Sequence, residues 1–124
     1  MITESLLLYL GICESVLKRF NEAFPDGCIV NEDNLRIAND HYLPITWLVK
    51  RLHDLRFIND ETYSIYVTAK ETCYAATNDI FLSDYSLELK RKTARDALYK
   101  VNLLAYNVLK TTNFDSIKVG VQHV

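Results

Sequence analysis

A group of polar and basic side chains within residues 44–55 offers the clearest chemistry in the sequence. If this stretch is a helix with about 100° per residue, Thr46, Lys50 and His53 fall within about 60° of one another. Arg51, next to Lys50 in the sequence, is a second cation in the same stretch. Lys50 and Arg51 could contact phosphate oxygens or guanine edges, the usual targets of such side chains in nucleic acid. The alternative is a solvated helix face with ordinary charges.

Trp47 belongs to the same stretch and falls at the border between its polar and apolar faces. One interpretation is that the ring is half-buried against a neighbouring element. The other is that it anchors a protein partner, because tryptophan is enriched among the residues that dominate the binding energy of interfaces. The two interpretations imply different functions, and both remain open from the sequence.

The histidine and acidic residues, which could support catalysis or metal binding, are not spaced as they are in known catalytic or metal-binding motifs. His53 and Asp54 are neighbours in sequence, and neighbouring side chains on a helix do not face each other. The three histidines, at positions 41, 53 and 123, lack the spacing of metal ligands. No nucleophile elbow or phosphate-binding loop occurs. The sequence therefore predicts a protein that is not an enzyme and that holds no metal or other cofactor.

The composition is that of a globular domain. Of 124 residues, 49% are apolar and 24% are charged. This length favours one domain with a substantial core. No apolar run reaches the eighteen or so residues needed to span a membrane, and the N-terminus lacks the basic start of a signal peptide. The three cysteines, Cys13, Cys28 and Cys73, have no CxxC spacing, so we expect buried reduced thiols in a cytoplasmic protein.

The distribution of charge is uneven. The formal net charge is −2. Residues 1–40 hold 7 acids and 3 bases, whereas residues 41–124 hold 9 acids and 11 bases. Nucleic-acid binders are usually basic, at least locally. The basic excess after residue 40 is therefore compatible with nucleic acid, while the negative total favours a protein partner.

The apolar pattern of residues 44–68 predicts a helix followed by a β-hairpin. Pro44 suits the first turn of a helix, and an apolar stripe with helical spacing follows it. The members of this stripe are Ile45, Leu48, Val49, Leu52 and Leu55. After the short apolar pair at 57–58 and a polar turn at 59–62, Tyr63, Ile65 and Val67 alternate with other residues as on a half-buried strand.

This pattern resembles a known family. The segments LVKRLHDLRFI and YSIYVTAKE look like the recognition helix and the wing of a bacterial winged helix-turn-helix domain, over roughly residues 28–75. The resemblance implies that a helix over 32–39 and the helix over 44–55 form a helix-turn-helix unit. The second helix would enter the major groove with Thr46, Lys50, Arg51 and His53. Unlike a wing that contacts phosphates, residues 58–68 carry two acids and no base.

The rest of the chain is predicted to be mainly helical. Caps and helical spacing indicate helices over 3–24, 68–78 and 84–111, the last capped by Ser83. A short strand is expected at 28–30. Residues 113–124 form a tail that frays or adds a strand with Ile117, Val119 and Val121, beyond a domain of residues 1–112.

The helix over 84–111 has an apolar stripe whose spacing alternates between three and four residues, as in coiled coils. The remaining elements are too small to cover this stripe, and monomers rarely expose an apolar patch of such size. We therefore expect a two-fold homodimer. The predicted interface consists of Leu98, Val101, Leu104, Ala105 and Val108.

These observations predict a mainly α fold with a small β-hairpin, namely a winged helix-turn-helix with a long C-terminal helix. The leading function is sequence-specific binding of double-stranded DNA by a small transcriptional regulator. The alternative is a protein-interaction module on the same scaffold without DNA binding, which Trp47, the acidic wing and the net charge favour. A third interpretation is a plain four-helix bundle in which residues 63–67 are only a connector.

Overall fold

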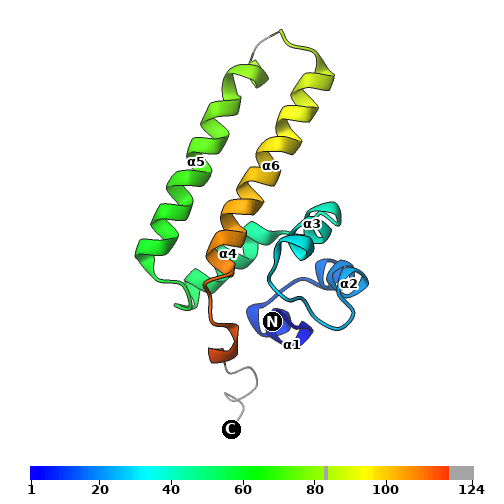
Figure 1. Cartoon of the computed structure of the whole chain (residues 1–124), viewed down its shortest axis with the longest axis vertical. Helices are drawn as coiled ribbons and strands as arrows, with labels where there is room; N and C mark the ends of the chain where they lie inside the picture. The colour runs from blue at the N-terminus through cyan, green and yellow to red at the C-terminus, as the bar shows by residue number, and fades with distance from the viewer. Residues whose placement is uncertain (83, 118–124) are drawn as a thin grey trace.

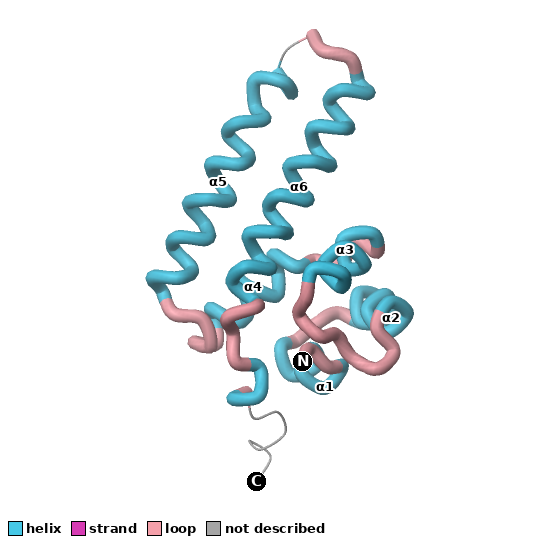
Figure 2. The backbone as a smooth tube through the Cα atoms, in the orientation of Figure 1, coloured by secondary structure: helices cyan, strands magenta, loops and turns pink. Residues whose placement is uncertain are grey.

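The computed structural model describes residues 1–82 and 84–117, and the regular elements of this part of the chain are helices (Figures 1 and 2). The elements in order are α1 (Glu4–Leu10), α2 (Glu14–Ala23), α3 (Glu32–Asp40), α4 (Ile45–Asp54), α5 (Asp60–Leu82), α6 (Leu87–Leu109) and the 3₁₀ helix η1 (Phe114–Ser116). Between the described residues, strand-like pairing is limited to an isolated antiparallel bridge between Ile2 and Cys28. The short strand expected at 28–30 is thus reduced to one residue pair.

The predicted β-hairpin is wrong, and with it the winged helix-turn-helix fold. Residues 60–67 form the first two turns of α5, so they are neither a wing nor a connector. The Asn59 side-chain oxygen accepts a hydrogen bond from the Thr62 N–H at 2.8 Å, which starts the helix as an N-cap residue does. The exposure is the reverse of the strand prediction, since Tyr66 is 3% exposed and Ile65 is 67% exposed.

The helix predicted over residues 3–24 is two helices. The first, α1, ends at Gly11, whose φ of 87° lies in the left-handed region that glycine adopts without strain. The Gly11 N–H donates to the Leu8 carbonyl at 3.1 Å, which satisfies one of the carbonyls left free at the end of α1. The chain then turns and begins α2 at Glu14.

The helices predicted over 32–39 and 44–55 are confirmed as α3 and α4. The predicted cap of α3 is also present, because the Asn31 side-chain oxygen accepts from the Asn34 N–H at 2.8 Å. By contrast, α5 begins eight residues before the helix predicted from residue 68. Ser86 caps α6 through its hydroxyl, and the predicted cap Ser83 lies outside the described residues.

The molecule has a compact base and a long projection (Figure 1). The base contains α1 to α4, and the antiparallel pair α5 and α6 extends away from it as a helical hairpin. The core is centred on α4, whose Val49 and Leu52 are completely buried. The Asn102 amide, in the half of α6 near the base, donates to the Asn39 side-chain oxygen at 2.8 Å and links α6 to α3.

The start of the predicted tail belongs to the core. Phe114, in η1, and Ile117 after it are both buried among the residues of the base. The tail therefore does not fray at residues 113–117. The positions predicted to continue a strand, Val119 and Val121, lie outside the described residues.

Candidate functional site

The predicted DNA-binding face of α4 is mostly covered. Of the residues of α4, only Lys50 and Asp54 are exposed, and Thr46 is half-buried. The Lys50 Nζ lies 3.3 Å from an Asp54 carboxylate oxygen, so the accessible cation has an acid beside it. A recognition helix needs an open face with several side chains free to reach bases or phosphates. The geometry of α4 does not provide such a face among the described residues.

Arg51 connects α4 to α1 instead of pointing freely into solvent. Its Nε donates to the carbonyl oxygen of Leu10 at 2.7 Å, and the side chain is half-buried. Leu10 is the last residue of α1, where carbonyl groups lack partners within the helix. A cation at this end is also favoured by the helix dipole. Arg51 therefore has a structural role that its spacing in the sequence does not indicate.

His53 connects α4 to the start of α5. Its ring stacks on Tyr63, with 3.9 Å between ring centroids and an interplanar angle of 4°. Its Nε2 lies 2.7 Å from an Asp60 carboxylate oxygen, and its Nδ1 is buried with no hydrogen-bond partner among the described residues. This arrangement assigns the proton to Nε2, which donates to Asp60. His53 is thus also engaged inside the molecule.

The contact between His53 and Asp60 gives a pH-dependent prediction. The hydrogen bond from His53, followed by the charge of Arg56, holds the pKa of Asp60 below its ordinary value of 3.8. Such a carboxylate contributes stability above the pKa of the unfolded chain, and the contribution is lost as the pH falls through the lower pKa of the folded state. We expect a carbon NMR titration of the Asp60 carboxyl to have its midpoint below 3.8.

The matched variant for this titration is His53→Phe. It keeps an aromatic ring against Tyr63 but removes the N–H that donates to Asp60. The midpoint for Asp60 should therefore rise toward the ordinary value. The same midpoint in both proteins would show that His53 does not stabilise the ionised carboxylate.

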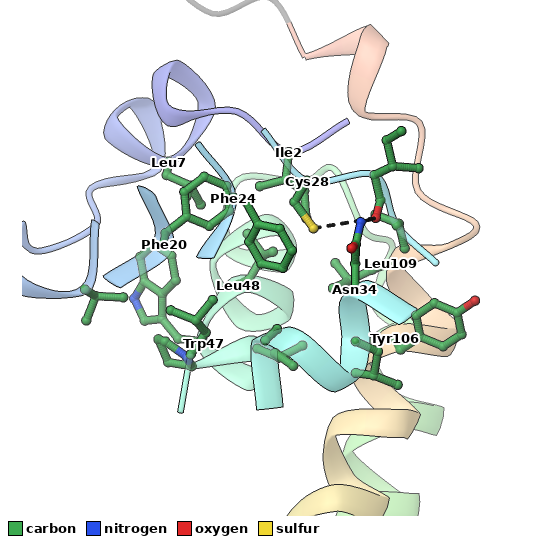
Figure 3. Close-up of a pocket in the computed structure, with 18 of the residues that line it drawn as sticks. Ile2, Leu7, Phe20, Phe24, Cys28, Asn34, Trp47, Leu48, Tyr106 and Leu109 are labelled. Carbon is green, nitrogen blue, oxygen red and sulfur yellow. Dashed lines mark hydrogen bonds between the residues drawn. The ribbon is translucent and has the colours of Figure 1, made fainter. Parts of the chain in front are cut away.

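A small apolar pocket lies where α2, α3 and α4 meet the N-terminal segment (Figure 3). Its volume is about 80 Å³. Trp47 is half-buried, packs against the core and forms part of the wall together with Phe20 and Phe24. Two asparagines at its edge already have hydrogen-bond partners: the Asn34 amide donates to the Ile29 carbonyl at 2.7 Å, and the Asn31 side-chain oxygen accepts from the Asn34 N–H. The pocket is smaller than the cavity of about 150 Å³ known to hold benzene.

The cysteines differ in their surroundings. Cys28 lines the pocket and is buried, and this burial raises its pKa to about 11, so the thiol stays protonated at neutral pH. Cys73 is only partly buried and Cys13 is exposed, so the prediction of three buried thiols is correct for Cys28 alone. In the described part of the chain, no group of three or more His, Cys, Asp or Glu side chains could hold a metal.

The predicted dimer interface on α6 is mostly occupied within one chain. Val101, Ala105 and Val108 are buried against the chain's own core. Leu104 is partly buried, and only Leu98, which is 41% exposed, remains open. A second copy could not reach the three buried side chains in this conformation.

Among the side chains that the structure describes, those in the distal half of the hairpin are not buried. We define the distal hairpin as residues 67–96, and none of the side chains described in this range is buried. Large apolar side chains are nevertheless present there and exposed: Tyr74, Tyr85, Leu87 and Leu89. Helices in proteins owe most of their stability to the packing of an apolar face. The distal hairpin is therefore a described part of the surface where apolar side chains of two helices remain exposed to solvent.

Comparison with known proteins gives no match: no protein-family model, no curated protein and no solved structure is significantly similar to the chain. None of these comparisons supports the resemblance to winged helix-turn-helix domains. In the described residues, no helix is long and apolar enough to cross a membrane. The function is therefore inferred from the surfaces of the molecule.

Proposed function

We propose that the chain is a protein-interaction module and that the distal hairpin is the surface that binds helices of a partner. The observation that carries this proposal is the absence of buried side chains between residues 67 and 96, among those described, in a segment with exposed leucine and tyrosine. Leu87 is 63% exposed, although such residues usually lie inside a helical bundle. Extended apolar patches on proteins mark sites of interaction.

Binding of duplex DNA through α4 has less support. Arg51 and His53 hydrogen-bond to Leu10 and Asp60, and Lys50 is paired with Asp54. Protein contacts with DNA depend mainly on cations that are free to neutralise phosphates. Rearranging α4 to release these side chains would disturb contacts that hold α1 and α5 in place.

Site-specific photo-cross-linking in cells that produce the protein tests the proposal. Tyr74 and Leu87, both exposed in the distal hairpin, are replaced one at a time by benzoylphenylalanine. The control position is Tyr42, which is 76% exposed in the turn between α3 and α4. We expect discrete adducts from both hairpin positions and none from Tyr42, because only the hairpin is covered by a partner. Absence of adducts from the hairpin, or equal adducts from Tyr42, would contradict the proposal.

A further inference from the structure

We propose that the partner bound by the distal hairpin is a second copy of this chain, with α5 of each copy packed against α6 of the other. This inference rests on the proposed function, and it names the partner. It also differs from an interface centred on Val101, Ala105 and Val108, because those side chains are already buried within one chain.

The first support is an apolar stripe on α6 that continues beyond the part buried by α5 and the base. Near the base the stripe is buried, at positions 101, 105 and 108. Towards the tip the same alternation of three and four residues continues to Leu98 and Ala94, then to the charged Arg91, and then to Leu87. Leu98, Ala94 and Leu87 are exposed. Apart from Arg91, the stripe therefore keeps the register of a helical bundle towards the tip, while α5 and the base bury only the half near the base.

The second support is the charge of the two helices. The segment 60–82, which is α5, holds four acids and one base, a formal charge of −3. The segment 87–109, which is α6, holds two acids and five bases, a formal charge of +3. In a two-fold arrangement of four helices, each α5 can have α6 of its own chain on one side and α6 of the second copy on the other. Opposite charges are then neighbours at every contact, and like charges lie on the diagonals.

The third support is the low polarity of the outer face of α5. Ile65 is exposed on this face. Thr72, seven residues further along the helix, lies on the same face, and its hydroxyl donates to the Thr68 carbonyl at 2.9 Å. This hydroxyl has its partner within α5, so burial against a second helix would not leave it unsatisfied. The face is thus suited to packing against the leucines of α6.

A pair of charge-reversal variants tests this arrangement with the full-length protein. One variant carries Arg91→Glu and Arg95→Glu on α6, and the other carries Glu61→Lys and Glu71→Lys on α5. All four wild-type side chains are exposed. Each variant alone has like charges on α5 and α6 of the facing copies, so we expect its dimer dissociation constant to rise at least about tenfold over wild type. An equimolar mixture restores opposite charges at both contacts and should dimerise.

Sedimentation velocity distinguishes the outcomes, because the dimer has twice the 14.4 kDa mass of one chain. A wild-type dimer, two weakened variants and a restored mixture support the proposal. Folding defects cannot explain restoration, since mixing does not change the charges within either chain. A chain that carries all four substitutions provides a second check, because it should dimerise with itself but not with wild type.

Three results would overturn the inference. A wild-type protein that stays monomeric at about 100 µM excludes the second copy as a partner at any useful affinity. A dimer that ignores both charge reversals excludes the packing of α5 against α6, and so does a mixture that fails to recover. If the wild type is monomeric while photo-adducts form at Tyr74 and Leu87, the proposed function remains and only the identity of the partner is wrong.

Discussion

Replacement of Leu52 by Ala is expected to lower the free energy of unfolding by about 2–5 kcal/mol. Leu52 is completely buried in α4, where it packs in the core that joins the base to the hairpin. Truncation removes buried methyl groups and leaves a cavity that a close-packed core can only partly close. Urea denaturation followed by circular dichroism measures the change.

The matched control is Leu98→Ala, the same substitution on the exposed part of α6. In dilute protein, where self-association is minimal, it should cost less than about 1 kcal/mol, because Leu98 is 41% exposed and lies outside the core that encloses Leu52. Similar losses for Leu52 and Leu98 would mean that α4 is not the centre of the core. They would also weaken the argument against a free recognition helix.

Replacement of Arg51 by Ala should have the second largest effect, a loss of about 1.5–3 kcal/mol, because the hydrogen bond involves a charged group in a partly buried place. The Leu10 carbonyl at the end of α1 would lose its partner. Lys50→Ala is the control, since its exposed pair with Asp54 is worth less than about 1 kcal/mol.

Comparison of Lys50→Ala with Arg51→Ala also distinguishes a structural role of these side chains from a role in binding nucleic acid. If both side chains served mainly to contact DNA, both substitutions would leave the unfolding transition nearly unchanged. We expect a large change for Arg51 alone, measured by the same urea titration. Equal and small effects would contradict the structural role of Arg51.

Helix starts with local chemical signals could be predicted from the sequence. Asn31 caps α3 because its side chain accepts a hydrogen bond from a residue three positions later. The same signal occurs at Asn59 with two acids after it, but the alternation of Tyr63, Ile65 and Val67 suggested a strand. The five residues 63–67 are too few to distinguish the two-residue period of a strand from the 3.6-residue period of a helix. Tyr63, Tyr66 and Val67 also have helical spacing, three and four residues apart. The cap at Asn59 is the signal that distinguishes the helix from the strand.

The partners of the candidate site residues could not be predicted, because they depend on tertiary structure. Arg51 meets Leu10 from 41 positions away in the chain. His53 meets Asp60 across the bend between two helices, and no spacing rule applies there. The apolar stripe on α6 was visible in the sequence. Which half of the stripe is buried depends on how far the hairpin extends beyond the base. The sequence does not contain this information, and the structure does.

The uneven packing of the hairpin has a consequence for how the molecule opens. Segments with few buried contacts exchange their amide hydrogens through low-energy openings, whereas a core exchanges only through global unfolding. The distal hairpin should therefore open many times before the α4 core opens once. A partner that binds there must hold α5 and α6 in register, so part of its intrinsic binding energy offsets the entropy of ordering these turns. The observed affinity is thereby lowered, and complexes that form through this surface are expected to dissociate readily.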